Sequence, residues 1–225
     1  MPEDEDGILF VMLIFDESQF KKAIRILRDG GLVIAPTETF YGIIADAWSS
    51  KAVDRLVEIK ARDYGKPIPL IAGDIIVVSS TAAVLPSIFK LLAEKFWPGP
   101  LTLVLKAARG LPGGITAGTD SIGIRVPAQS PALDLAKCYR GPLTATSANF
   151  SGKPPARHIK ELDEELVMAV DLVIDGGWTP GVQPSTVLNL TTDPPELIRA
   201  GALGKEVIDF LAKRSDRGQG TGNRE

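Results

Sequence analysis

The apolar residues of this chain come in short runs, which restricts the folds that it can adopt. The longest run, Ile8–Phe15, has eight residues, whereas a helix needs about 20 apolar residues to cross a bilayer. Short apolar runs bounded by turn residues are typical of buried β-strands. Strands are therefore predicted at Ile8–Phe15, Leu32–Ala35, Leu70–Ala72, Leu101–Lys106, Ser121–Val126, Leu143–Ala145, Leu172–Ile174, Thr186–Leu190 and Glu196–Arg199.

Segments with the apolar spacing of a helix separate most of these strands. In Lys51–Lys60, for example, the apolar residues share one helix face, and Ser49 or Ser50 can cap its N-terminus. Helices are predicted at Gln19–Arg28, Lys51–Lys60, Ser87–Trp97, Ala132–Tyr139, His158–Met168 and Lys205–Lys213. A short segment that contains Asp193-Pro194-Pro195 separates the last two strands, which suits an antiparallel pair. The sequence thus predicts an α/β fold with a mixed sheet.

Composition excludes several classes of protein. The chain has 225 residues, a formal net charge of −3, one cysteine (Cys138) and one histidine (His158). It can form neither an intrachain disulfide nor a Cys/His zinc site, and no metal site is predicted. A chain of this length can bury one sufficient hydrophobic core without such staples. A single domain is expected over residues 16–213.

Both ends of the chain are expected to lie outside this domain. Residues 1–15 are predicted to form an N-terminal extension and a first strand, with Met1 or Met12 as the start. The acidic stretch Pro2–Asp6 and the missing basic region argue against a signal peptide, so we expect a cytoplasmic protein without membrane association. Residues 214–225 are polar and rich in glycine, and a disordered tail is predicted there.

The familiar nucleotide-binding and hydrolase motifs are missing from the sequence. No G-x-x-x-x-G-K-[ST] motif occurs, and no G-x-G-x-x-G follows a strand. The single histidine, His158, lies in a charged helical stretch and is a poor candidate for a general base. An enzyme with this sequence would therefore act by positioning and charge stabilisation rather than through a histidine.

Hydroxyl and cationic side chains instead cluster beside the predicted strands. These clusters are Pro36–Gly42, Lys60–Pro67, Asp120–Pro127, Thr144–Gly152 and Gln183–Val187. Ligands of open α/β sheets collect at strand ends, and cations with nearby hydroxyl groups suit a phosphorylated, hydroxylated ligand. Each cluster taken alone is also ordinary turn chemistry. Their coincidence favours a binding site.

Seven short motifs occur together and in order over roughly residues 18–204. They are Pro36-Thr37-Glu38-Thr39 with Tyr41-Gly42, Lys60-x-Arg62, Trp97-Pro98-Gly99-Pro100-Leu101-Thr102, Ile124-Arg125-Val126-Pro127, Ser147-Ala148-Asn149 with Ser151-Gly152, Pro184-Ser185-Thr186-Val187 and Ile198-Arg199-x-Gly201. In these motifs the chain resembles the YrdC/TsaC family of threonylcarbamoyl-AMP synthases. It is closest to the short, single-domain form.

The resemblance implies a fold and a reaction. The fold would be a YrdC-like, mixed and twisted sheet with flanking helices around a broad electropositive cleft. The chain would act as a nucleotidyltransferase: L-threonine, bicarbonate and ATP would give threonylcarbamoyl-AMP, pyrophosphate and water, for the threonylcarbamoyladenosine at position 37 of tRNA. Mg²⁺ would arrive with ATP, with no tightly bound protein-ligated metal. The expected partners are downstream threonylcarbamoyl-transfer proteins and, weakly, RNA.

The resemblance also implies roles for individual residues. Threonine would be held by Thr39, Arg125 and Ser185. ATP would be surrounded by Lys60, Arg62, Lys66, Ser121, Ser147, Asn149 and Arg199, with Lys60 and Arg62 stabilising charge during catalysis and no residue acting as acid or base. Two positions depart from the family pattern: Ile71 stands where many relatives carry histidine, and Lys66 stands where asparagine is common.

Two other functions remain open from the sequence. The same type of domain occurs in carbamoyltransferases that form carbamoyl adenylate, although these chains carry additional modules. The chain could also be a binding module for double-stranded RNA or tRNA, which would recognise shape and phosphates and would weaken steeply with salt. A net charge of −3 and the absence of an arginine-rich run disfavour RNA binding as the main role.

Overall fold

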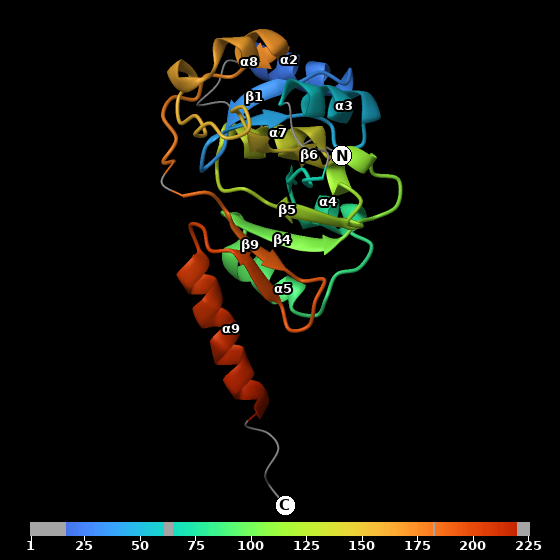
Figure 1. Cartoon of the computed structure of the whole chain (residues 1–225), viewed down its shortest axis with the longest axis vertical. Coiled ribbons are helices and arrows are strands. Elements are labelled where there is room, and N and C mark those ends of the chain that lie inside the picture. The colour runs from blue at the N-terminus through green and yellow to red at the C-terminus, as the bar shows by residue number, and fades with distance from the viewer. Residues whose placement is uncertain (1–16, 61–64, 182, 220–225) are drawn as a thin grey trace, which may run out of the picture.

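The computed structural model describes residues 17–60, 65–181 and 183–219, with side chains through Arg214. Its strands form two sheets that lie one above the other in the view of Figure 1. The four-stranded sheet has the order β7-β2-β1-β8, and the six-stranded sheet has the order β10-β9-β4-β5-β3-β6. Both contain parallel and antiparallel neighbours, so the mixed α/β class is confirmed, but with two sheets instead of one.

The four-stranded sheet is built around one hairpin. Strand β1 (Val33–Pro36) pairs antiparallel with β2 (Tyr41–Ile44), and residues 37–40 form the turn between them. On either side lie β8 (Leu172–Val173), parallel to β1, and β7 (Thr146–Ser147), antiparallel to β2. The turn of this hairpin carries the Thr37-Glu38-Thr39 motif, so the fold places it at the edge of a rigid element.

The six-stranded sheet has β4 (Leu101–Lys106) and β5 (Ser121–Arg125) at its centre as an antiparallel pair. On one side β9 (Thr186–Asn189) runs parallel to β4 and is followed by β10 (Glu196–Arg199), which is antiparallel to β9 as predicted. The other side holds β3 (Leu70–Ile71) and β6 (Leu143–Thr144).

Helices cover the outer faces of both sheets (Figure 1). They are α2 (Glu17–Arg28), α3 (Ser50–Ile59), α4 (Ile75–Thr81), α5 (Phe89–Phe96), α6 (Gly113–Thr116), α7 (Pro131–Tyr139), the 3₁₀ helix η1 (Ile159–Glu161), α8 (Glu164–Ala169) and α9 (Gly204–Gln219). Helix α9 packs at its start through Val207 and Phe210, whose ring meets Phe96 edge-on at 5.6 Å, and then leads away from the sheets. No helix among the described residues is long and apolar enough to span a membrane.

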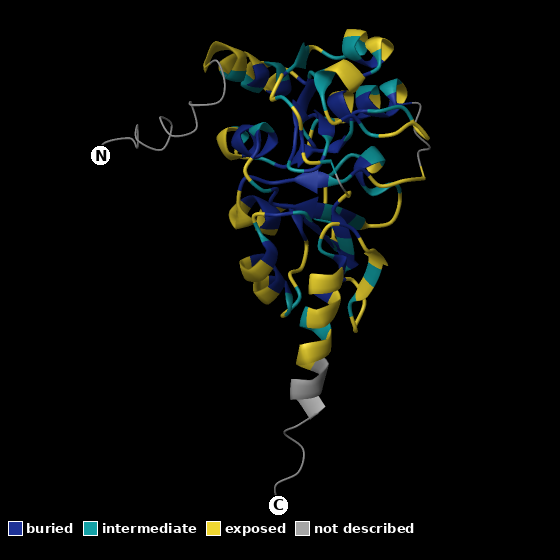
Figure 2. Cartoon of the chain, turned by 90° about the vertical axis from the view of Figure 1, so that its left-hand side faces the viewer, coloured by how far each residue is buried: buried dark blue, intermediate teal, exposed yellow. Residues whose placement is uncertain are grey.

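The buried apolar residues fill the strands and the inward faces of the helices (Figure 2). One large cluster joins residues of both sheets with α3, α4 and α5. A second, smaller cluster packs α2 and α7 against the strands, with Leu27, Val33 and Leu135 fully buried. Ile71 belongs to this second cluster, so the position that departs from the family pattern is part of the core.

Most predicted elements occur within a few residues of their expected bounds, and the prediction of β4 at Leu101–Lys106 is confirmed. The predicted helix His158–Met168 is wrong, because the chain breaks at Leu162 and Asp163 into η1 and α8. Asp163 is an N-cap whose carboxylate accepts a hydrogen bond from the Glu165 backbone, so it begins a new helix. The predicted strand Ile8–Phe15 lies outside the described residues.

The C-terminal prediction also needs correction. Helix α9 does not end near Lys213, as predicted, but continues through Gln219. The first glycine of this stretch comes only at Gly218, so no earlier glycine weakens the helix. Disorder of residues 214–225 stays a prediction. The final residues, 220–225, lie outside the described part of the chain.

Candidate functional site

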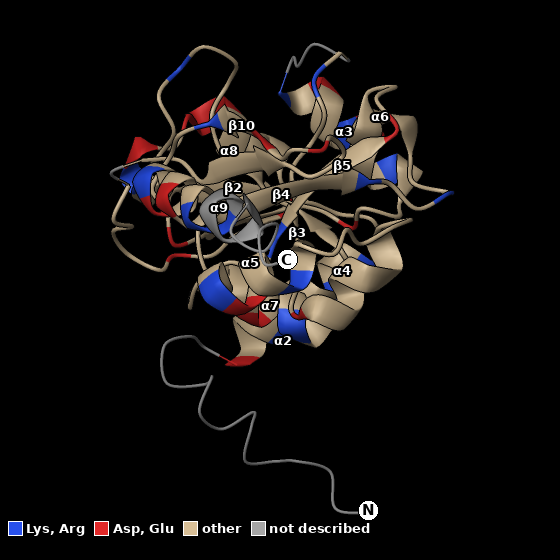
Figure 3. Cartoon of the chain, turned by 90° about the horizontal axis from the view of Figure 1, so that it is seen from below, with Lys and Arg blue, Asp and Glu red and all other residues tan. Residues whose placement is uncertain are grey.

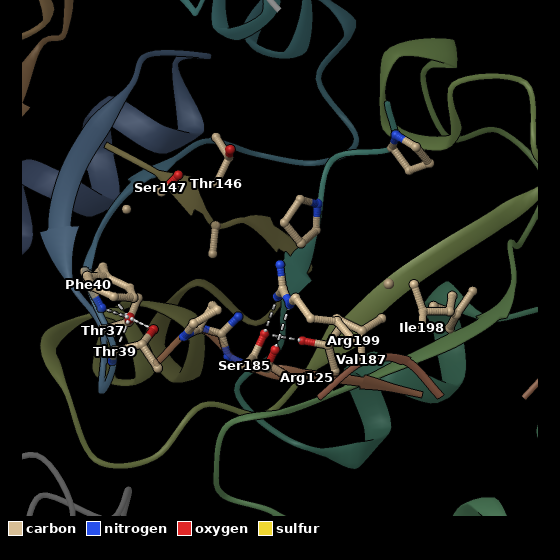
Figure 4. A pocket seen from close by; sticks show the side chains of 18 of the residues that line it. Thr37, Thr39, Phe40, Arg125, Thr146, Ser147, Ser185, Val187, Ile198 and Arg199 are labelled. Carbon is tan, nitrogen blue, oxygen red and sulfur yellow. Dashed lines mark hydrogen bonds between the residues drawn. The ribbon is translucent and has the colours of Figure 1, made fainter. Parts of the chain in front are cut away.

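A cavity of about 830 Å³ lies between the two sheets. Figure 4 shows that Arg125, Arg199 and Ser185 gather on one side of it, with Thr37, Thr39 and Phe40 on the other. Its lining is Thr37, Thr39, Phe40, Tyr41, Gly42, Pro67, Pro69, Thr102, Val104, Thr119, Ser121, Gly123, Arg125, Ala145, Thr146, Ser147, Pro155, Pro184, Ser185, Val187, Asn189, Thr191, Ile198 and Arg199. The volume is that of a site for a small organic ligand or cofactor.

Alternate residues of the six-stranded sheet form one wall of the cavity. On β5 these are Ser121, Gly123 and Arg125, while the intervening Ile122 and Ile124 are fully buried in the core. Strands β4 and β9 show the same alternation, because successive side chains of a strand point to opposite faces of the sheet. The apolar half of each strand secures the fold, and the small or polar half faces the cavity.

The turn between β1 and β2 forms part of the opposite wall. The Thr37 hydroxyl donates a hydrogen bond to the Phe40 carbonyl at 2.8 Å and accepts one from each of the Thr39 and Phe40 amides, at 3.1 and 3.2 Å. It also lies 3.0 Å from the Thr39 hydroxyl. A threonine at the start of such a turn is ordinary turn chemistry. Here it also fixes the Thr39 side chain at the cavity.

Two guanidinium groups lie on the six-stranded wall, Arg125, which is buried, and Arg199, which is more exposed. Nε of Arg125 donates to Oε1 of Glu38 at 3.1 Å, and the two side chains are only 6% and 10% exposed. Arg199 donates from Nε to the Ser185 carbonyl at 3.0 Å and from Nη2 to the Ser185 hydroxyl at 3.1 Å. Burial, and then the charge of Arg125, lower the pKa of Arg199. Two cations held this close in a cavity make an attractive site for an anion.

The Ser185 hydroxyl has one hydrogen left to donate. Its oxygen accepts hydrogen bonds from Arg199 and from the Thr102 hydroxyl, the latter at 3.0 Å. Because a hydroxyl has two lone pairs and one hydrogen, both of its acceptor positions are used by these partners. The Ser185 O–H can therefore point toward a ligand in the cavity.

Lys60 and Asn149 support the cavity wall from behind. The Lys60 side chain is almost fully buried, and its ammonium group donates to the Ser147 carbonyl and lies 3.5 Å from Oδ1 of Asn149. The Ser147 hydroxyl lies 2.5 Å from the same Asn149 oxygen. Of these three residues, only Ser147 lines the cavity.

The structure brings together six of the residues that the sequence singled out: Thr39, Ser121, Arg125, Ser147, Ser185 and Arg199 all line the cavity. Lys60 and Asn149 lie directly behind it. Lys66 is exposed and outside the lining, and Arg62 lies outside the described residues, so their roles remain predictions.

Sequence reasoning missed Glu38 and Thr102 as members of the site. Thr102 could have been found from the alternation of β4, in which Thr102 and Val104 fall on the face opposite Leu101 and Leu103. Glu38 lies between two threonines in a turn and carries no signal of its own. Its partner Arg125 is 87 residues away in the sequence.

Comparisons with known proteins show which family the chain is similar to. Residues 25–201 match the sequence model of the Sua5_yciO_yrdC family, which is described as "Telomere recombination". The threonylcarbamoyl-AMP synthase of Pyrococcus abyssi is 38% identical over 194 residues, which cover 86% of this chain and 57% of the Pyrococcus protein. The threonylcarbamoyl-AMP synthase of Thiobacillus denitrificans is 34% identical over 166 residues, which cover 74% of this chain and 88% of that protein.

A solved structure is similar over the same region. The crystal structure of Pyrococcus abyssi Sua5 complexed with L-threonine superposes with a TM-score of 0.83 at 38% identity, covering 88% of this chain and 58% of that one. The chain thus spans a little over half the length of this relative. The match of sequence and of fold extends over both sheets and the cavity between them, and on this evidence the chain belongs to the Sua5/YciO/YrdC family.

Proposed function

We propose that this chain forms threonylcarbamoyl-AMP and pyrophosphate from L-threonine, bicarbonate and ATP, for the modification of tRNA at position 37. The observation that carries the proposal is the end of the cavity where Arg125 and Arg199 flank the Ser185 hydroxyl. The names of the relatives and the bound L-threonine of the Pyrococcus structure support it.

In this proposal the amino acid occupies the arginine end of the cavity. Arg125 attracts its carboxylate, because guanidinium groups bind carboxylates through directed and charged hydrogen bonds. Arg199, which the resemblance assigns to ATP, adds a second positive charge nearby. The Ser185 O–H and the Thr39 hydroxyl lie at this end and supply polar partners for the remaining groups. These two arginines also supply the positive charge expected of the cleft.

ATP then extends along the cavity toward Ser121 and Ser147. We assign Lys60 and Asn149 to fix the Ser147 segment from behind, and Arg62 and Lys66 to the phosphates. The phosphates bring Mg²⁺ with them as part of the substrate, which offsets charge on the leaving pyrophosphate. The cavity lining of the described residues offers hydroxyl, amide and guanidinium groups for the nucleotide.

The chemistry needs positioning more than proton transfer. The amine of threonine and CO₂ derived from bicarbonate give a carbamate, whose oxygen attacks the α-phosphorus of ATP while the bond to pyrophosphate breaks. The cationic side chains stabilise the negative charge of this transfer. A site between two sheets also reduces the contact of the carbamate with water, which would return it to CO₂ and amine.

Mass spectrometry of the product tests the proposal. The protein is incubated with ATP, L-threonine and ¹³C-bicarbonate, and pyrophosphate is measured in parallel. We expect a threonylcarbamoyl-AMP that carries one ¹³C atom, formed together with an equal amount of pyrophosphate. Matched incubations without threonine or without bicarbonate should give neither. Pyrophosphate release that is independent of threonine would contradict the proposal.

The same assay separates the two alternatives. A carbamoyltransferase would form carbamoyl adenylate from carbamoyl phosphate and ATP, so carbamoyl phosphate replaces threonine and bicarbonate in one incubation. An RNA-binding module would retain RNA in a strongly salt-dependent way without turnover. In Figure 3, which views the molecule from below, Lys and Arg residues occur next to Asp and Glu residues along the helices.

We further propose that the adenylate passes to threonylcarbamoyl-transfer proteins in the cytoplasm. A mixed carbonic–phosphoric anhydride is reactive toward water, so its consumer must be close by. Addition of the transfer proteins and tRNA to the assay should convert the ¹³C label into modified tRNA.

A further inference from the structure

Glu38 connects the two walls of the cavity. It lies on the turn between β1 and β2 of the four-stranded sheet, and its carboxylate accepts a hydrogen bond from Nε of Arg125 on β5 of the six-stranded sheet. With side chains only 10% and 6% exposed, this ion pair is shielded from solvent. It joins elements that are otherwise held together by the core.

The pair is not arranged for stability alone. Oε1 of Glu38 meets Arg125, but Oε2 is buried and has no hydrogen-bond partner among the described residues. A buried carboxylate oxygen without a donor raises the free energy of the folded state. A buried ion pair in which only one oxygen is used is therefore weak evidence for a stabilising role.

The contact has a directional effect on Arg125. A guanidinium group is planar, so a bond at Nε fixes the plane in which the terminal nitrogens lie. Within the described residues the only hydrogen bond of the Arg125 side chain is this one to Glu38, and the side chain lines the cavity. The two terminal nitrogens therefore remain for a ligand. The negative charge of Glu38 also offsets part of the repulsion between Arg125 and Arg199.

The same contact determines where the turn lies. Thr39 follows Glu38 directly, and its hydroxyl is fixed through Thr37. Because Glu38 is bound to the opposite wall, the distance between Thr39 and the Ser185 end of the cavity depends on the ion pair. The Glu38–Arg125 ion pair thus controls both the orientation of the Arg125 guanidinium and the position of the Thr39 hydroxyl.

We infer that Glu38 is a positioning residue for the amino-acid half of the site, which aims the terminal nitrogens of Arg125 at the substrate carboxylate and holds Thr39 opposite Ser185. The inference rests on the proposed function and adds to it. It predicts different effects on the binding of the two substrates. Glu38 acts at the arginine end of the cavity, and its loss leaves the Ser147 end, with Lys60 and Asn149, unchanged.

Two variants of Glu38 and one control test the inference. Glu38→Ala removes both the charge and the acceptor, and Glu38→Gln keeps an acceptor for Arg125 while removing the charge. The matched control is Asp171→Asn, which breaks another acid–arginine pair, with Arg55, away from the cavity lining. Threonine and ATP affinities are measured separately by calorimetry, turnover is followed by pyrophosphate release, and circular dichroism verifies folding.

We expect Glu38→Ala to raise KM and Kd for threonine roughly 10- to 100-fold, the effect of a small misplacement of a binding group. Its Kd for ATP should stay within about twofold, because the change is confined to one end of the cavity. Glu38→Gln should recover most of the threonine affinity, and Asp171→Asn should leave both affinities unchanged. In ¹⁵N-labelled protein the Nε–H signal of Arg125 should exchange with water faster in Glu38→Ala than in the wild type.

Three results would overturn the inference: unchanged threonine affinity in a folded Glu38→Ala protein, equal losses for threonine and ATP, or Glu38→Gln as impaired as Glu38→Ala. Measurements on the wild-type protein distinguish failure of the proposed reaction from failure of the inference about Glu38. If it binds threonine but releases no pyrophosphate, the proposed reaction fails while the role of Glu38 is still decided by the binding data. If it binds no threonine, both fail.

Discussion

At the scale of single residues, the proposed function gives the hydroxyl groups of Thr39 and Ser185 the task of recognising the substrate. Both face the cavity in positions fixed by hydrogen bonds from neighbouring groups. Serine lacks one methyl group of threonine, and valine has a methyl in place of the hydroxyl. A lost methyl contact costs about 1–3 kcal/mol, whereas polar groups left unpaired can discriminate by up to about 10⁴-fold or more.

We therefore predict that serine is a poor but measurable substrate and that valine is essentially none. Pyrophosphate release with each amino acid at equal concentration checks this, with threonine as the reference. Equal turnover of valine and serine would mean that the site does not recognise the hydroxyl. The roles given to Thr39 and Ser185 would then have to be withdrawn.

The residue scale also shows where sequence reasoning reaches its limit. Arg125 and Ser185 can be selected from the sequence because cationic and hydroxyl side chains recur beside predicted strands, whereas Arg199 is found only through the family resemblance. Glu38 cannot be selected in this way, because its role depends on an ion pair with Arg125 on the other sheet. Lys60 shows the reverse: its residue type suggests direct contact with a ligand, whereas the structure buries it behind Ser147.

At the scale of elements, the start of β9 is held against the loop that follows β10. A Cβ atom at Gly201 would lie only 2.2 Å from the Pro184 carbonyl oxygen and 2.6 Å from the Ser185 carbonyl carbon. The Gly201 amide also donates to the Thr186 hydroxyl at 3.2 Å. Only glycine permits this approach, and the approach fixes the segment that carries Ser185.

We predict that Gly201→Ala displaces Ser185, lowers stability by about 1–3 kcal/mol through overpacking, and raises KM for threonine about tenfold or more. The matched control is Gly113→Ala, since a Cβ at Gly113 would meet nothing within 4 Å. Urea unfolding and pyrophosphate release measure the two effects. A Gly201→Ala protein that behaves like Gly113→Ala would refute the proposed link between this loop and the site.

A second element-scale prediction concerns Asp171, which joins α3 to β8 and the start of β1. Its Oδ2 accepts from Nη1 of Arg55 at 2.6 Å and from the Leu32 amide at 2.7 Å. Burial acts to raise the pKa of Asp171, but the hydrogen bonds from Arg55 and Leu32 and the charges of Arg55 and Lys51 outweigh it, so this pKa is lowered.

A lowered pKa in the folded state means that the ionised carboxylate stabilises the fold above its unfolded pKa, about 3.9, and that this stabilisation is lost as pH falls through the folded pKa. Asp171→Asn should therefore lower the free energy of unfolding at pH 7 by about 1 kcal/mol, a modest amount because both side chains of the pair are 36% exposed. The difference should shrink below about pH 4. Urea titrations at both pH values, with Glu17→Gln as an exposed control, will show whether it does.

The elements themselves were largely predictable, and the failures have local causes. Strand β4 was predicted from its apolar run. Strand β2 was missed because Tyr41-Gly42 resembles part of a turn motif, and because the pairing of β2 with β1 cannot be deduced from composition. The helix predicted over His158–Met168 fails at Asp163, whose short carboxylate caps a new helix. In each case a local capping or pairing interaction overrides the apolar periodicity.

At the scale of the whole molecule, the cavity is lined by both sheets, so a ligand within it should stabilise the entire fold. We predict that ATP and threonine, each at about 100 times its Kd, raise the free energy of unfolding by about 2.7 kcal/mol per ligand. For a chain of this size that is roughly 5–11 °C in Tm per ligand. Differential scanning calorimetry with each ligand alone and with both checks it. A ligand-dependent rise in only one of two separate transitions would show that the sheets unfold independently.

The division into two sheets could not be predicted from the sequence, for a topological reason. Strands β1 and β2 are close to β3 along the chain, yet β3 pairs with β5 and β6 in the other sheet. Hydrophobic patterning identifies strands but not their neighbours, because neighbours are chosen by packing between distant segments. The cavity lies between two sheets because the strands pair in this way.

The alternation of the six-stranded sheet has a consequence for how this scaffold can diversify. Val104, Val187 and Gly123 face the cavity, while the residues between them hold the fold. Substitutions at the cavity-facing positions can change which ligand the pocket accepts without disturbing the residues that keep the protein folded. Selection, natural or in the laboratory, can therefore explore new ligands at these positions while the opposite face of the same strands stays constant.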